Sequence, residues 1–420
     1  VSVGGKQEPV RVSGSSSGAV AIAGWSVSLP DGLVGLEALA ATSLSGRDLL
    51  REIPASRWDL EQAVSMLLES QMDVASRVRH GGFMQGAELF EHVCFSISAA
   101  EASAMDPQQR QLLERGYAAL HAAGLRKPSL LGSVIAVGVG QWSSEFESVL
   151  MGTPAGGSVY VSTGFACSVT CGRVSFVLGL QGPCASYDTA CSASLVANHG
   201  NVRALQRFEC EAALSSGVNM ILSPATMRGN AIAGFTSIRG RSHTFDARAD
   251  GYARGEAIDA IACCDASGTP STVQVHGSAI RQDGRSASLT APNGQAQQGV
   301  LRASFEDASL KVAHAVALEA HGTGTALGDP IEAGAIAAVF LSQRDRFSDP
   351  LVVSSLKSNA GHTEPGAGIA GALKLLMQLR HMLIGPNAQL RNLNPHVSVV
   401  LNGNAASALP TQAGAMAGSA

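Results

Sequence analysis

The sequence predicts an α/β fold in which buried strands alternate with helices. Short apolar runs, typical of strands covered on both faces, recur along the 420 residues and are separated by segments of helical periodicity. No Pro-rich or charge-rich linker divides the chain after residue 19, so we expect one interlocked unit rather than separate domains. The predicted strands lie at residues 19–24, 133–138, 185–190, 212–220, 260–264, 315–319 and 351–355.

Two further segments can be assigned from composition and capping residues. Residues 1–18 are rich in Gly and Ser and predict a flexible N-terminal segment. A helix is predicted after Asp106, a good N-cap that is followed by Pro107 at the first helical position. Leu112, Leu113 and Leu120 form the apolar face of this helix, which ends near Gly124.

The composition excludes several classes of protein. Charged residues make up 15% of the chain, against about 25% in an ordinary soluble protein, so either a large face is hidden from solvent or the chain is part of something larger. A net charge of −4 predicts no nucleic-acid partner. No apolar run reaches about 18 residues, so no membrane span is expected. Eight cysteines without a C-x-x-C pair argue against a disulfide scaffold and favour a reducing, intracellular compartment, cytoplasmic or plastid.

Cys191 is the first candidate for chemistry, because it lies where a predicted strand meets a predicted helix. A sulfur at a helix N-terminus lies near unpaired backbone N–H groups and the positive end of the helix dipole, and both favour the thiolate. The alternative is a small buried hydrophobe, which is the commoner role of a free cysteine. The helix is predicted from Ser192 to about Phe208, with one face formed by Leu195, Val196, His199, Val202 and Leu205.

Two histidine segments follow the last two predicted strands. In Glu319-Ala-His-Gly-Thr-Gly-Thr325, glycines around His321 allow a sharp turn and close approach of a ligand, and Thr323 and Thr325 supply hydroxyls. In Lys357-Ser-Asn-Ala-Gly-His-Thr-Glu364, a Lys, a His and a carboxylate share one loop, which couples their charge states and can fix the tautomer of His362. The first segment alone could equally be an ordinary glycine-rich turn. In the second, any one of the three residues would most often be solvated surface, but all three after a buried strand in a charge-poor chain favour a site.

Two motif matches are rejected. The segment 366–371 reads G-x-G-x-x-G, but a dinucleotide site also needs an acid about 20 residues further on, and residues 365–420 contain no Asp or Glu. We expect these small residues to permit close helix packing. No metal site is predicted, because the eleven histidines form no H-x-x-x-H, and Cys167 and Cys171 have no second pair of ligands.

Taken together, these segments resemble the β-ketoacyl synthases, specifically the ketosynthase domains of type I modular polyketide synthases and fatty acid synthases. The nucleophile motif is Asp188-Thr-Ala-Cys-Ser-Ala-Ser-Leu195, followed in order by the two histidine motifs. Met105-Asp-Pro-Gln-Gln-Arg110, Phe245-Asp-Ala-Arg-Ala-Asp-Gly-Tyr252 and Gly328-Asp-Pro-Ile-Glu332 support the resemblance, which covers residues 19–397.

The resemblance implies a thiolase-like fold: two similar α/β halves, residues 19–265 and 266–420, stacked as α-β-α-β-α layers in a homodimer. It also implies that Cys191 takes an acyl chain from the phosphopantetheine arm of an acyl carrier protein. His321 and His362 would then promote decarboxylation of a malonyl group and stabilise the enolate, with support from Lys357 and Glu364. Thr323 and Thr325 would hold the pantetheine arm, no cofactor of the domain's own is implied, and adjoining synthase domains are expected.

The end of the sequence departs from the family pattern. Family members continue from an Asn-Pro segment, here Leu393-Asn-Pro-His396, into a Gly-Phe-Gly-Gly-type strand that supplies an oxyanion donor. This sequence stops where that strand should begin, so we expect a C-terminally truncated chain of low activity, whose acid-free tract after Glu364 packs against missing sequence or a second subunit. A non-elongating or non-catalytic ketosynthase-like scaffold remains the alternative.

Overall fold

All seven predicted strands are present in the computed structural model, which describes residues 18–65, 69–142, 144–267, 273–344, 349–401 and 407–416. The α/β class is therefore confirmed, while the predicted flexible segment lies outside the described residues except for Gly18. The strands are β1 (Val20–Leu29), β5 (Ile135–Gly140), β6 (Cys184–Tyr187), β7 (Ala212–Asn219), β8 (Ala257–Asp265), β10 (Ala317–Glu319) and β11 (Leu351–Ser354).

The larger sheet has the strand order β2-β1-β8-β7-β5-β6, where β2 is Leu33–Val34, and β9 (Gln274–Val275) pairs with β1. Strand β5 runs parallel to both β6 and β7, whereas β8 runs antiparallel to β1 and β7. The carboxyl ends of β5, β6 and β7 therefore meet at one edge of the sheet, where parallel sheets place their ligands.

One face of this sheet is covered by α4 (Pro107–Ala122) and α8 (Cys167–Leu178). The predicted start of α4 is confirmed, because Asp106 Oδ1 accepts the N–H of Gln108 at 2.8 Å and Pro107 follows at the first position. The predicted apolar residues of α4, Leu112, Leu113 and Leu120, all lie in the core that this face shares with β5 and α8.

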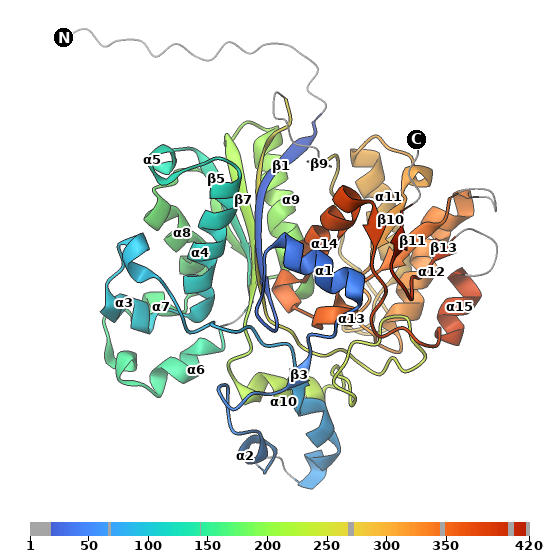
Figure 1. Cartoon of the computed structure of the whole chain (residues 1–420), viewed down its shortest axis with the longest axis horizontal. Helices are drawn as coiled ribbons and strands as arrows, with labels where there is room; N and C mark the ends of the chain where they lie inside the picture. Colours follow the sequence, from blue (N-terminus) through green and yellow to red (C-terminus); the bar gives the residue numbers. More distant parts are fainter. Residues whose placement is uncertain are drawn as a thin grey trace.

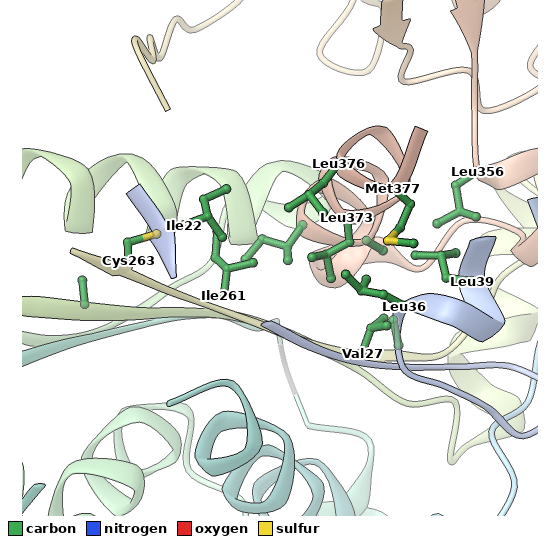
Figure 2. Packing of buried hydrophobic residues seen from close by; sticks show 14 of the residues in the cluster. Ile22, Val27, Leu36, Leu39, Ile261, Cys263, Leu356, Leu373, Leu376 and Met377 are labelled. Atoms are coloured by element: carbon green, nitrogen blue, oxygen red, sulfur yellow. The ribbon is translucent and has the colours of Figure 1, made fainter. Parts of the chain in front are cut away.

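The other face is covered by α1 (Leu36–Ser45), α9 (Ala193–Gln206) and α14 (Ala367–His381). Leu373 and Leu376 of α14 lie in one core with Ile22 of β1 and Ile261 of β8 (Figure 2). The acid-free tract after Glu364 therefore packs, over α14, within its own chain. The expectation that this tract packs against missing sequence or a second subunit is wrong for α14.

The smaller sheet consists of β10, β11 and β13 (Ser407–Ala408), all parallel, and α14 also contacts β10. A separate core packs α12 (Gly328–Phe340) and α15 (Pro395–Leu401), with α11 (Gly294–Asp307) at its side, against this sheet. Two sheets with helices outside and between them make the five layers that the resemblance implied (Figure 1).

Short elements complete the described chain. The last of them, β14, pairs antiparallel with β12, and the expected absence of a final strand stays a prediction. Among the described helices, none is both long and apolar enough to cross a bilayer. The short elements are α2 (Leu60–Ser65), α3 (Ala99–Ala104), α5 (Lys127–Leu130), α6 (Phe146–Met151), α7 (Val161–Gly164), α10 (Pro224–Ile232), α13 (Lys357–Ala360), β3 (Arg51–Glu52), β4 (His80–Gly81), β12 (Leu383–Ile384) and β14 (Gly414–Ala415).

The buried face of α9 differs from the predicted one. Val202 and Leu205 are buried as expected, but Leu195 is 47% exposed. Asn201 is buried instead, because its amide donates to the Leu214 carbonyl and the Ser215 hydroxyl of β7, both at 2.9 Å. Side-chain hydrogen bonds to the sheet, which an apolar pattern does not reveal, therefore add Asn201 to the buried face of α9.

Candidate active site

Cys191 lies in a single 3₁₀ turn, Ala190–Ser192, between β6 and α9. Strand β6 ends at Tyr187, earlier than predicted, because Asp188 starts a turn in which its Oδ1 accepts the N–H of Ala190 at 3.2 Å. Ala190 has φ 52°, a left-handed conformation that costs an L-residue roughly 1–2 kcal/mol. The turn therefore fixes the thiol directly before the first turn of α9.

His321 follows β10 on a glycine-rich turn that a carboxylate of α12 holds in place. Glu332 accepts the N–H of His321 at 2.6 Å and the N–H of Gly322 at 2.8 Å. Gly322 has φ 48°, and a Cβ there would come within 2.6 Å of Thr244, so the expected requirement for glycine is confirmed at this position. The backbone position of His321 thus depends on Glu332.

A second carboxylate of α12 holds the rest of this turn. Buried Asp329 accepts the N–H of Gly324 at 3.0 Å and the N–H of Phe245 at 2.6 Å. The hydroxyls of Thr323 and Thr325 lie 3.4 Å apart on the same turn, and Thr325 also accepts the N–H of Gly328 at 3.1 Å. Both threonines are thus placed beside His321, and their role toward a pantetheine arm stays a prediction.

The second histidine lies after β11. Lys357 begins α13, and Glu364, which has φ 48°, follows two residues after His362. The backbone N–H of Glu364 donates to Nδ1 of His362 at 3.2 Å. Because Nδ1 accepts this bond, the proton of the neutral imidazole must be on Nε2. His362 therefore carries a hydrogen-bond donor on the ring nitrogen opposite Glu364.

The three residues from distant parts of the sequence converge. Cys191 Sγ lies 4.0 Å from His321 Nε2, and the sulfur and one nitrogen of each of His321 and His362 all lie within 4.8 Å of one another. The two imidazole rings meet edge to face with centroids 5.5 Å apart, and Tyr252 packs edge to face on His362 at 5.0 Å. A thiol and two imidazoles therefore surround one small volume.

Burial determines the protonation states at this site. It raises the pKa of the Cys191 thiol, and the nearby charge of Lys357 lowers that pKa by less. Burial thus opposes the thiolate-favouring effect that the sequence predicts for a sulfur at the N-terminus of α9. Burial and Lys357 together hold the pKa of His362 well below its usual value. Surrounding protein and Lys357 also lower the pKa of His321, although its side chain stays partly open to solvent.

The same three side chains have a donor set that could bind a metal ion, since Cys and His ligands suit zinc. A metal on Nε2 of His362 would displace the proton that the bond from Glu364 keeps there. The hydrogen-bond pattern thus favours a donor role for His362 over ligation. The predicted absence of a metal stays a prediction.

Several residues at the site were missed from the sequence. Arg254 is fully buried and forms two bonds to Glu364, from Nε at 2.7 Å and from Nη2 at 2.8 Å, and a third to Glu145 at 3.0 Å. The sequence places Glu332 in the motif Gly328-Asp-Pro-Ile-Glu332, but it does not reveal that this carboxylate binds the N–H groups of His321 and Gly322. The low content of charged residues could have pointed to them. A buried charge is costly unless it is paired, so the few charged residues inside such a chain are expected to form ion pairs.

Comparison with known sequences gives two family matches. The family model described as "Beta-ketoacyl synthase, N-terminal domain" matches residues 17–263, and "Beta-ketoacyl synthase, C-terminal domain" matches residues 272–391. The chain is 41% identical over 385 residues to pikromycin polyketide synthase component PikAII of Streptomyces venezuelae, covering 90% of this chain and 10% of that protein. It is 40% identical over 369 residues to polyketide synthase GfsB of Streptomyces halstedii, covering 86% and 7%. The chain therefore spans a tenth or less of the length of these relatives.

Solved structures give the same result. The ketosynthase from module 6 of the bacillaene synthase of Bacillus subtilis 168 superposes with a TM-score of 0.85 at 29% identity, covering 96% of this chain and 68% of that one. The ketosynthase domain OzmH KS7 of the oxazolomycin system from Streptomyces albus JA3453 gives 0.86 at 28% identity, covering 95% and 68%. The predicted thiolase-like architecture is thereby confirmed.

Proposed function

Because this chain belongs to the β-ketoacyl synthase family, a family of acyl-transferring condensing enzymes, we propose that it extends an acyl chain by decarboxylative Claisen condensation. The observation that carries this proposal is the convergence of Cys191, His321 and His362 around one volume. A nucleophile and two neutral imidazoles are the groups that acyl transfer and enolate stabilisation require.

In the first step, Cys191 attacks the thioester of an acyl donor and becomes acylated. The thiol must first lose its proton, because burial favours the neutral form. The proton is lost to solvent, the charge of Lys357 stabilises the thiolate, and His321 Nε2, at 4.0 Å from the sulfur, can donate a hydrogen bond to it. The C–S bond of the donor breaks, the donor leaves as a thiolate that takes up a proton from solvent, and the acyl group remains on Cys191.

In the second step, a malonyl or substituted malonyl thioester occupies the same volume. The Nε2–H of His362 donates to the thioester oxygen, where negative charge develops as the C–C bond to the carboxylate breaks and CO₂ leaves. His321 contributes a second donor. The resulting carbanion attacks the acyl-Cys191 carbonyl, the C–S bond breaks, the chain is two carbons longer, and Cys191 is released as a thiolate, which regains a proton from solvent.

The carrier of both substrates is proposed to be the phosphopantetheine arm of an acyl carrier protein, with no cofactor bound by this domain itself. Thr323 and Thr325, which lie on the turn after His321, would bind this arm through their hydroxyls. The relatives are polyketide synthases many times the length of this chain, so we also propose adjoining synthase domains. An intracellular, reducing compartment stays a prediction.

A homodimer is proposed on the basis of the sheet edge. Strand β6 is the last strand of the larger sheet, and its neighbour α8 exposes 86% of Phe176. An edge strand beside an exposed aromatic residue is a site where a second copy can pair. Such an interface would lie directly beside the turn that carries Cys191.

The test separates the two steps. The purified chain is mixed with an acyl thioester, and acylation of Cys191 is measured by intact mass. A malonyl thioester is then added, and CO₂ release and the β-keto product are measured. Acylation followed by both products supports the proposal. Acylation without CO₂ release would indicate a non-elongating domain, and no acylation would indicate a scaffold.

A further inference from the structure

We infer that Arg254 is a positioning residue for His362: by clamping Glu364, it holds the backbone N–H that keeps the proton of His362 on Nε2. This inference rests on the proposed function, because it assigns His362 a donor role in decarboxylation. Arg254 does not approach the reacting atoms as a catalytic group would. Arg254 acts through Glu364. Its replacement should therefore affect decarboxylation and leave acylation of Cys191 nearly unchanged, and this difference can be tested.

The first part of the argument is the clamp itself. Arg254 Nε and Nη2 bind the two oxygens of Glu364 at 2.7 and 2.8 Å, a bidentate geometry that fixes the carboxylate plane. Nη2 also binds Glu145 Oε1 at 3.0 Å, and the guanidinium carbon lies 5.6 Å from the ring centroid of Trp142. Three of these four side chains are nearly fully removed from solvent, so the clamp is not weakened by water.

The second part is what the clamp holds. Glu364 has φ 48°, a conformation that a non-glycine residue keeps only when its surroundings impose it. In this conformation its N–H reaches Nδ1 of His362 at 3.2 Å. Without the clamp, Glu364 would no longer be anchored, and a shift of the peptide group that precedes it would carry this N–H away from Nδ1. His362 could then move its proton to Nδ1 and present a lone pair to the substrate oxygen.

The third part is that the two neighbours of Arg254 in the sequence, Ala253 and Gly255, also hold the backbone of His362. The N–H of His362 donates to the Ala253 carbonyl at 2.7 Å, and the N–H of Gly255 donates to the His362 carbonyl at 2.8 Å. Glu145 in turn accepts the N–H groups of Leu222 and Ser223 at 2.8 and 2.7 Å. The orientation of His362 is thereby tied to the loop after β7 in the larger sheet.

The experiment compares Arg254→Lys with Arg57→Lys. Lysine keeps the charge but cannot form the two-pronged bond. Arg57 is a matched control, because its Nη2 binds both oxygens of buried Glu256 at 2.9 and 2.7 Å and has no bond to His362. We expect R254K to lower CO₂ release from a malonyl thioester by about 10- to 100-fold, because an oxyanion donor is misdirected. Acylation of Cys191 should change by less than about threefold, and R57K should leave both steps near wild type.

A second readout does not depend on activity. ¹⁵N spectra of histidine-labelled protein distinguish the two imidazole tautomers, and the His362 signals are assigned from their loss in His362→Asn. Wild type should have its proton on Nε2, and R254K should lose that preference. An unchanged tautomer with CO₂ release equal to that of R57K would overturn the inference. If R254K does not fold, Glu364→Gln, which weakens the same clamp, takes its place. A wild-type chain that releases no CO₂ would instead refute the proposed function, and the tautomer would still test the clamp.

Discussion

The two sheets hold their active-site residues in different ways. On the larger sheet, Cys191 is positioned by a local turn: the left-handed Ala190, whose N–H donates to Asp188, a 3₁₀ turn and the first turn of α9. On the smaller sheet, His321 lies on a loop whose N–H groups donate to the Glu332 carboxylate. His362 accepts the N–H of Glu364, whose carboxylate is bound by Arg254. A nucleophile needs only a fixed position, whereas a hydrogen-bond donor also needs a fixed direction and tautomer.

The largest effect is expected from removing the nucleophile. Cys191→Ala should lower acyl transfer by at least about 10³-fold, because no other group can form the thioester. The extent of acylation is measured by intact mass spectrometry after incubation with an acyl thioester. Cys94→Ala is the control, since Cys94 is an exposed free cysteine on another part of the chain. Acylation of the C191A variant at the wild-type rate would place the nucleophile elsewhere.

Removing the hydrogen-bond donor His362 should affect decarboxylation much more than acylation of Cys191. His362→Ala should lower CO₂ release by about 10²–10³-fold, the usual effect of losing an oxyanion donor, while acylation of Cys191 falls by less than about tenfold. His199→Ala is the matched control, because His199 binds the Ser278 hydroxyl away from the site. Equal losses in both steps would mean that His362 acts before decarboxylation.

The two steps should also differ in pH dependence. Burial raises the pKa of Cys191 above its usual range, so below that pKa the thiolate fraction rises about tenfold per pH unit, and acylation should rise with it between about pH 6.5 and 8.5. The pKa of His362 is held well below its usual value, so His362 stays neutral over this range, and its contribution to CO₂ release should stay flat. Single-turnover rates of each step measure this, and acylation that does not rise with pH would contradict the protonated resting thiol.

Weakening a carboxylate clamp should have a smaller effect. Glu332→Gln keeps one acceptor oxygen for the N–H groups of His321 and Gly322, so we expect CO₂ release to fall roughly tenfold with the overall fold intact. Glu306→Gln, an exposed residue of α11, is the control. Wild-type turnover in E332Q would show that the backbone of His321 is held by its own turn.

The smallest effect concerns stability and a buried acid of the larger sheet. Asp259 accepts one N–H, from Gly217 at 2.9 Å, and its Oδ2 has no partner. Burial raises its pKa well above the usual value, so above about pH 4 the folded chain holds a proton that the unfolded chain releases, and stability falls as pH rises. Asp259→Asn should therefore raise stability by about 1–3 kcal/mol near pH 7 and by less near pH 4. Denaturant melts at both pH values test this, and equal gains would contradict the shift.

The sequence predicted the strands and the candidate catalytic residues better than it predicted the side-chain contacts that hold those residues in place. Apolar runs located all seven strands, and the chemistry of Cys191, His321 and His362 was visible in their motifs. The pairing of Arg254 with Glu364 joins residues 110 positions apart, and no periodicity reports such a contact. The pKa of the Cys191 thiol has the same limit, because the helix terminus is local and visible in sequence, whereas desolvation comes from the whole fold.

Helix α14 has a consequence for how the molecule can be divided. Its residues lie late in the chain, yet Ile369, Leu373 and Met377 complete the core of the larger sheet, whose strands come from the early part (Figure 2). A fragment ending near residue 265 would leave that core uncovered, and in the remaining fragment α14 would keep its contact with β10 but expose the apolar face that packs on the larger sheet. The segments that match the N-terminal and C-terminal family models therefore share one core. If one of these segments is exchanged between related synthases, the residues of α14 and of the larger sheet that contact each other have to be exchanged together.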